Sequence, residues 1–256
     1  SDAMVRWFAG WMGARSMGQK LTMVQKFRPG YLAPVIGIMK GLTDPIVVQL
    51  MGQTAENLAW KYGISREDMD AFAVESHRRG VAAQDAGHFA DELVPLIDRD
   101  GTVYASDDGV RRDASMDGMA KLKPFFDKKY GRVTPANSSQ ITDGATWLVL
   151  ASAAAVERFG LEPVGRIVDS QWAGLEPEQM GLGPVHAATP ILQRHGLALE
   201  DLDLIEINEA FSAQVIACLR AWQDADYCRS RLGLPGALGA VDPARLNVDG
   251  GAVALG

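Results

Sequence analysis

The sequence has 256 residues, 47% of them hydrophobic and 22% charged, and carries a net charge of −7 at pH 7. This is an ordinary globular composition with enough apolar material for one large or two smaller cores. The acidic balance argues against a nucleic-acid partner, although a local basic patch can still hold an anionic ligand. No apolar run is long enough to span a membrane, and Cys218 and Cys228 form neither a disulfide framework nor a metal-binding spacing.

The first half of the chain predicts loops followed by two helices. Residues 1–50 mix aromatic, basic and methionine residues with prolines, which indicates loops and short helices. A helix is predicted over Ile46–Tyr62 and ends at Gly63. Ser65 then opens a second helix that ends at Gly87. Within it, His77-Arg78-Arg79 is most simply an exposed polar face.

The rest of the chain alternates strand-like and helical patterns, which is typical of an α/β fold. Short apolar runs rich in β-branched residues predict strands at Leu93–Ile97, Ala145–Ala151, Gly165–Trp172, Leu204–Ile207 and Leu246–Val248. Capping residues and helical spacing predict four helices. The first is Ala153–Phe159, with Ser152 as its N-cap and Gly160 ending it; the others run from Pro184 to about His195, from Phe211 to Trp222, and over Tyr227–Leu232.

The segment Asp203–Val215 is where the pattern points to chemistry. A buried strand runs into the polar turn Asn208-Glu209, which opens a helix. Side chains in such turns lie beside free N–H groups at the positive end of the helix dipole. Spacing alone favours a structural role for Asn208 as the N-cap of that helix.

Five segments resemble those of one enzyme family. Asn-Glu-Ala-Phe at Asn208–Phe211 resembles the NEAF motif of the thiolases, the acetyl-CoA acyltransferases. Four further segments match thiolase segments in the same order, and the resemblance covers nearly the whole chain: MGQTAENLA (Met51–Ala59), ANSSQITDGA (Ala136–Ala145), MGLGP (Met180–Pro184) and NVDGGAVALG (Asn247–Gly256).

The resemblance implies a layered α-β-α-β-α architecture, incomplete here, with an α-rich loop domain. We expect residues 1–118 to be the loop domain that covers CoA, residues 119–162 the end of the N-terminal thiolase half, and residues 163–256 a truncated C-terminal half. Since the two glycines of the Gly250-Gly251 pair carry no side chain, we expect the backbone to approach a ligand closely there.

The chemistry that the resemblance implies is transfer of an acyl group between the CoA thiol and the Cα of an acyl-CoA, through a cysteine thioester. Of the family's catalytic groups only the asparagine is present, as Asn208, which would orient a water toward the thioester carbonyl at the floor of a CoA pocket. The nucleophilic cysteine and the histidine are missing, so we expect an internal, inactive piece of a longer thiolase. The alternative is a non-catalytic protein that binds acyl-CoA or a partner, and a dinucleotide-dependent oxidoreductase would need a G-x-G-x-x-G that is absent.

The resemblance also supplies the residues that would contact acyl-CoA. Arg111 would meet the nucleotide end, although a pair of surface arginines explains Arg111-Arg112 equally well. The contacts expected for the pantetheine arm and the acyl group are Phe125, Phe126, Pro135, Ser139, Ile141, Met180, Ala210 and Phe211. Ser138-Ser139-Gln140 stands where the common family pattern has Ala-Ser-Gly, so the local turn differs.

Beyond acyl-CoA as substrate, few partners are implied. We expect no permanently bound cofactor and no metal. By analogy with the family, the protein would be a homodimer or homotetramer. The low cysteine content fits a reducing compartment, and we expect a cytoplasmic protein.

Overall fold

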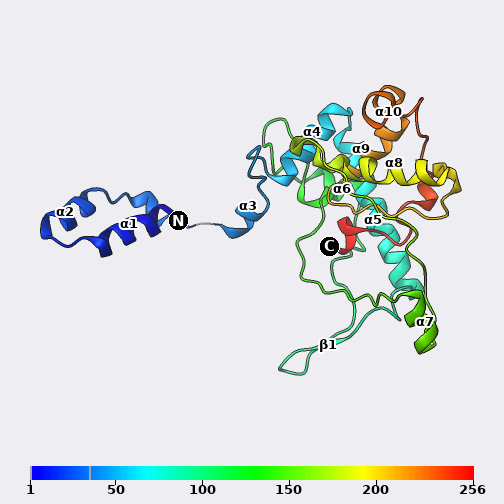
Figure 1. The fold of residues 1–256 in the computed structure, drawn as a ribbon, viewed down its shortest axis with the longest axis horizontal. Helices are drawn as coiled ribbons and strands as arrows, with labels where there is room; N and C mark the ends of the chain where they lie inside the picture. The colour runs from blue at the N-terminus through cyan, green and yellow to red at the C-terminus, as the bar shows by residue number, and fades with distance from the viewer. Residues whose placement is uncertain (1, 35) are drawn as a thin grey trace. The chain divides into compact units, whose positions relative to one another are not determined.

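The computed structural model describes residues 2–34 and 36–256. They divide into two compact units, Ser1–Leu50 and Met51–Gly256, whose elements are labelled in Figure 1. Among the described residues, none of the helices combines the length and the apolar character that crossing a bilayer requires.

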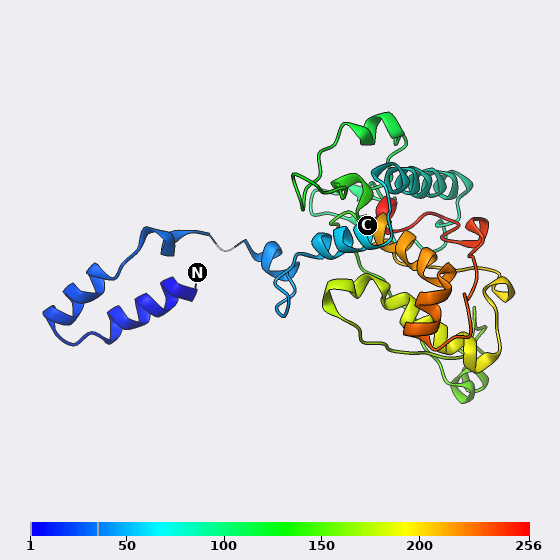
Figure 2. The ribbon, with the colours of Figure 1, turned by 90° about the horizontal axis from the view of Figure 1, so that it is seen from above.

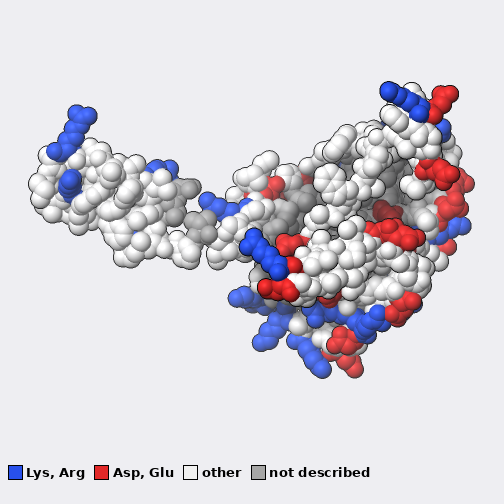
Figure 3. Space-filling model, turned by 90° about the horizontal axis from the view of Figure 1, so that it is seen from below, with Lys and Arg blue, Asp and Glu red and all other residues white. Residues whose placement is uncertain are grey.

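The first unit is built from short helices: α1 (Asp2–Gly13), α2 (Met17–Gln25), a 3₁₀ turn at Pro29–Leu32, and α3 (Gly37–Gly41). Trp7 holds α1 and α2 together, because its indole N–H donates to the carbonyl of Met23 at 2.7 Å and its ring meets Phe27 edge-on at 5.1 Å. Figure 3 shows Lys and Arg side chains on the surface of this unit. The loops and short helices predicted here are confirmed.

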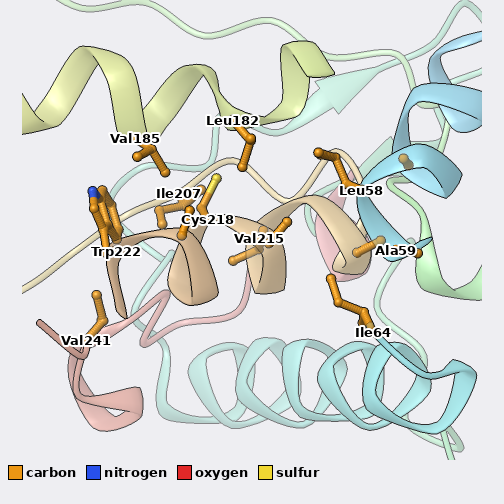
Figure 4. Close-up of a cluster of buried hydrophobic side chains, with 14 of the residues drawn as sticks. Leu58, Ala59, Ile64, Leu182, Val185, Ile207, Val215, Cys218, Trp222 and Val241 are labelled. Carbon is orange, nitrogen blue, oxygen red and sulfur yellow. The ribbon is translucent and has the colours of Figure 1, made fainter. Parts of the chain in front are cut away.

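The second unit packs its helices around one main hydrophobic core. Four helices contribute most of it: α4 (Met51–Lys61), α5 (Arg66–Ala86), α8 (Gly183–His195) and α9 (Ser212–Gln223). Figure 4 shows Val215, Cys218 and Trp222 of α9 among side chains from the other elements. These three residues are buried, as their helical spacing predicts.

Capping residues fix several helix ends as the sequence predicts. The Ser65 hydroxyl accepts from the amide of Asp68 at 3.0 Å at the start of α5, and Gly87 ends the helix with φ = 76°. Ser152 and Gly160 delimit α7 (Ala153–Phe159) in the same way. The predicted start at Ile46 is wrong, because α4 begins at Met51.

The strand predictions fail where a strand needs partners far away in the sequence. Strand β1 (Leu96–Ile97) pairs antiparallel with β2 (Val103–Tyr104), so the strand predicted at Leu93–Ile97 is confirmed in shorter form. Residues 145–151 and 165–172 form no strand, and Trp147 and Trp172 are 93% and 91% exposed. A strand requires a neighbouring backbone and apolar cover, and the described chain gives these segments neither.

The last two predicted strands meet in a single parallel bridge. Ile205 donates its N–H to the carbonyl of Arg245 at 2.8 Å and accepts from the amide of Asn247 at 2.9 Å. The two segments are therefore adjacent and extended, but too short to count as strands. Their pairing places the turn after Ile207 beside the turn after Asn247.

The remaining elements are short. They are α6 (Met116–Ala120), α10 (Ala225–Leu232), α11 (Ala252–Leu255) and 3₁₀ turns at Pro135–Asn137, Pro177–Leu182, Leu199–Asp201 and Pro243–Arg245. The end of the chain lies beside α5, where α11 makes most of its contacts (Figures 1 and 2). This contact brings residues 250–256 close to the middle of α5.

Candidate functional site

The turn that contains Asn208 has one exposed and one buried polar side chain. Asn208 is exposed and does not line the three cavities that flank α5. Helix α9 begins only at Ser212, with Phe211 in the N-cap position and no side-chain cap. The N-cap role considered for Asn208 is therefore wrong, and the side chain is accessible to a ligand.

Glu209, the next residue, organises this turn from inside. Its carboxylate is 1% exposed and accepts hydrogen bonds from the Ser76 hydroxyl at 2.6 Å, the Asn247 side-chain amide at 2.8 Å and the backbone amide of Val253 at 3.1 Å. It thus joins α5, the Asn208 turn and α11. Sequence reasoning missed Glu209, because nothing local distinguishes a buried glutamate from a solvated one.

The glycines near the end of the chain approach protein atoms and not a ligand. Gly250 has φ = 87°, and a Cβ there would lie 2.8 Å from the Gly80 amide nitrogen and from the Ser76 carbonyl oxygen of α5. A Cβ on Gly251 would collide with the Glu209 carboxylate. The expectation of a close ligand approach is therefore corrected: these glycines let the backbone pack against α5 and Glu209.

A cavity of about 370 Å³ lies between α5, α6 and α11. It brings together two of the predicted contacts, Arg111 and Pro135. Its lining is mixed, with polar residues such as His77 and Gln140 and apolar residues such as Met119 and Leu122. The lining residues are His77, Arg111, Asp113, Ala114, Ser115, Gly118, Met119, Leu122, Pro135, Ala136, Gln140 and Val253.

His77 contradicts the expectation of an exposed polar face on α5. Its side chain is 2% exposed, and its ring Nδ1 accepts from the amide of Arg111 at 3.2 Å. Burial, assisted by the nearby Arg111 charge, lowers the pKa of His77, so the ring is neutral with its proton on Nε2. Arg79 is also engaged, donating to the Pro243 carbonyl at 2.8 Å, and of the three residues only Arg78 is exposed.

Four predicted pantetheine contacts lie together at the start of α9. Phe126 meets Phe211 edge-on at 6.0 Å, and the amide of Ser139 donates to the Ala210 carbonyl at 2.9 Å. These contacts join the chain after Pro135 to the start of α9. The other predicted contacts, Phe125, Ile141 and Met180, are exposed.

Both cysteines are core side chains. Cys218 and Cys228 are fully buried, and burial raises the pKa of the Cys218 thiol to about 12. The Cys218 thiol therefore stays protonated near neutral pH, and the burial of Cys228 keeps a substrate from reaching its sulfur. Across residues 2–34 and 36–256, no group of three or more His, Cys, Asp or Glu side chains is placed to hold a metal ion.

Comparison with protein families finds two adjoining matches. The model of the thiolase N-terminal domain matches residues 11–154, and that of the thiolase C-terminal domain matches residues 161–256. The beta-ketothiolase BktB of Cupriavidus necator is 42% identical over 251 residues, covering 95% of this chain and 59% of that protein. An acetyl-CoA acetyltransferase of Chromobacterium violaceum is 44% identical, covering 84% of this chain and 52% of its own length. The chain thus spans a little over half the length of these relatives.

Solved structures give the same result for the fold. A human mitochondrial 3-ketoacyl-CoA thiolase in complex with CoA superposes with a TM-score of 0.74 at 37% identity, covering 88% of this chain and 54% of that one. The Bacillus anthracis acetyl-CoA acetyltransferase superposes with a TM-score of 0.75 at 38% identity, covering 86% of this chain and 52% of that chain. The expected α/β class is confirmed by these neighbours, although few of its strands form here. The chain belongs to the thiolase family.

Proposed function

We propose that this chain forms the CoA-binding side of an acyl-CoA C-acyltransferase. The enzyme would move an acyl group between the thiol of CoA and the Cα of an acyl-CoA, in the thiolytic or the condensing direction. The acyl group would pass through a cysteine thioester, and the buried Cys218 and Cys228 are unsuited to that role. Acyl-CoA is then a substrate, and no permanently bound cofactor is required.

The observation that carries the proposal is the cavity that Arg111 and Pro135 share. A guanidinium group can stack on adenine or donate two parallel hydrogen bonds to a phosphate, which suits the nucleotide end of CoA. At the start of α9, the cluster of Phe126, Ser139 and Phe211 offers apolar surface with a hydroxyl group. The pantetheine arm, thin and mostly apolar with two amides, needs such a surface.

We assign the remaining predicted contacts to the same substrate. Ala210 would lie along the pantetheine arm, Met180 near the acyl group, and Phe125 and Ile141 would be covered by the bound substrate. The exposure of Phe125, Ile141 and Met180 leaves these three side chains accessible to a ligand.

Asn208 would orient a water molecule that binds the carbonyl oxygen of the thioester. Its exposure and its place just before α9 support this role. We predict that Asn208→Ala in the full-length protein lowers kcat for acetoacetyl-CoA thiolysis by about 100-fold, since one oxyanion contact is lost. An unchanged kcat would refute the role given to Asn208.

The alternative is a non-catalytic protein that binds acyl-CoA or a partner. The acetoacetyl-CoA thiolysis assay distinguishes it from the proposed acyltransferase. The full-length protein should cleave acetoacetyl-CoA, whereas CoA binding without turnover would favour the alternative. The 256 residues alone should give no turnover, because neither buried cysteine can act as the nucleophile. Turnover by that chain at an ordinary enzymatic rate would contradict the proposal.

The oligomeric state, the compartment and the domain division are also proposed. We propose that the full-length protein is a homodimer or homotetramer in the cytoplasm, and the two free cysteines fit such a reducing compartment. The division into residues 1–118, 119–162 and 163–256 stays a prediction.

A further inference from the structure

Gln140 ties together two segments that are far apart in the sequence. Its side-chain amide nitrogen donates to the Gly109 carbonyl at 2.7 Å and to the Ala254 carbonyl at 2.8 Å, with the Val253 carbonyl at 3.4 Å. All three acceptors are carbonyl oxygens, so only the nitrogen end of the amide can face them. One side chain therefore links the loop before Arg111 to α11.

The packing around this link is tight. A Cβ on Gly109 would lie 3.1 Å from the Ala254 carbonyl oxygen and 3.2 Å from the Gln140 amide nitrogen. The backbone of the loop thus approaches α11 as closely as a glycine allows. Gln140 occupies the seam between them.

The same loop is held from a second side. The Arg111 amide donates to His77 of α5, two residues after the carbonyl that Gln140 holds. The backbone at residues 109–111 is therefore fixed at two points, one on α5 and one on Gln140. His77, Arg111 and Gln140 all line the cavity of about 370 Å³.

Gln140 also departs from the common thiolase pattern Ala-Ser-Gly, which has a glycine at the position of Gln140. A glycine has no side chain to reach either carbonyl. The link between the loop and α11 through residue 140 therefore depends on the residue that this chain carries.

We propose that Gln140 is a positioning residue for the nucleotide end of acyl-CoA. Gln140 holds residues 109–111 against α11 and so fixes the position of Arg111 at the cavity before the ligand binds. Binding then costs less conformational entropy of this loop. The inference rests on the proposed function, because it assumes that this cavity takes CoA. Loss of the hydrogen bonds from the Gln140 side chain should weaken the binding of acyl-CoA and leave the rate of the chemical step unchanged.

The test compares Gln140→Met with the wild-type full-length protein. Methionine keeps the length and removes the donors, so Kd for CoA by calorimetry and KM for acetoacetyl-CoA should rise about fivefold, as expected for one lost hydrogen-bonding group. The value of kcat should stay within twofold. Hydrogen exchange of the amides at residues 105–113 should accelerate about tenfold.

Two further variants make the test decisive. Gln140→Asn keeps the amide but is one methylene shorter, so it should behave like Gln140→Met even if the latter folds poorly. Gln193→Met, on the exposed side of α8, should leave Kd and exchange unchanged.

The failures are distinguishable. Wild-type binding of CoA with unchanged Kd and exchange in both Gln140 variants would overturn the inference, as would parallel losses of kcat and melting temperature. A wild-type protein that binds no CoA would overturn the proposed function itself and this inference with it.

Discussion

At the scale of single residues, the Glu209 carboxylate holds three segments together from the interior. Its three hydrogen-bond donors come from α5, from Asn247 and from α11. Removing the carboxylate leaves these buried donors without an acceptor, which costs more than the hydrogen bonds themselves contribute. The exposed Asn208 depends on this neighbour for the shape of its turn.

We predict that Glu209→Ala lowers the free energy of unfolding by about 3 kcal/mol, measured by urea denaturation of the full-length protein. Glu206→Ala is the matched control, because Glu206 lies in the same segment and is exposed; its effect should stay within about 0.5 kcal/mol. Equal effects of the two substitutions would contradict the role given to Glu209.

His77 makes stability depend on pH in a defined direction. Its pKa is lowered in the folded state by burial first and by Arg111 second, with Asp113 opposing weakly. Below about pH 6.5 the unfolded chain binds a proton that the folded chain resists. Stability is therefore complete above that pH and is lost as the pH falls toward the folded-state pKa.

His77→Gln should reduce this loss, because glutamine can still accept from the Arg111 amide but takes up no proton. Urea midpoints measured from pH 7.5 to pH 5 should fall less steeply in the variant than in the wild type. His88→Gln, at an exposed position, serves as the comparison. If the urea midpoint of His77→Gln falls with pH as steeply as that of the wild type, His77 is not the cause of the pH dependence.

At the scale of elements, local signals decided what could be predicted. Caps such as Ser65 and Ser152 act within one helical turn, so the sequence alone placed the starts of α5 and α7 correctly. The segments 145–151 and 165–172 have strand-like composition but no strand, because pairing depends on residues distant in the sequence. The candidate site shows the same limit. The resemblance to the family predicts Arg111, Pro135 and the cluster around Phe211, whereas the burial of His77 and Glu209 depends on contacts that only the folded chain makes.

The two serine caps give a matched prediction. Ser65→Ala should lower the free energy of unfolding by about 1 kcal/mol, since it removes a capping box from a helix that packs on the core. Ser152→Ala should cost less, because α7 has no buried residue and can fray without loss of packing. Chemical denaturation of both variants checks the order, and a larger effect at Ser152 would contradict it.

At the scale of the whole molecule, the chain has the family's fold and leaves some apolar segments uncovered. Apolar side chains at residues 147–150 and at Trp172 are exposed, and the chain spans a little over half the length of its relatives. The cavity between α5, α6 and α11 is nevertheless formed by residues of this chain. We therefore expect CoA to bind at that cavity.

The most direct test is calorimetric titration of CoA into the full-length protein carrying Arg111→Ala or Arg112→Ala. Arg111 lines the cavity, whereas Arg112 is paired with Asp85 at 2.6 Å on the surface. We predict that Arg111→Ala raises Kd about tenfold, as expected for loss of a charged hydrogen-bonding group, and that Arg112→Ala leaves it within about twofold. Equal Kd values for the two variants, or a larger loss with Arg112→Ala, would contradict the account.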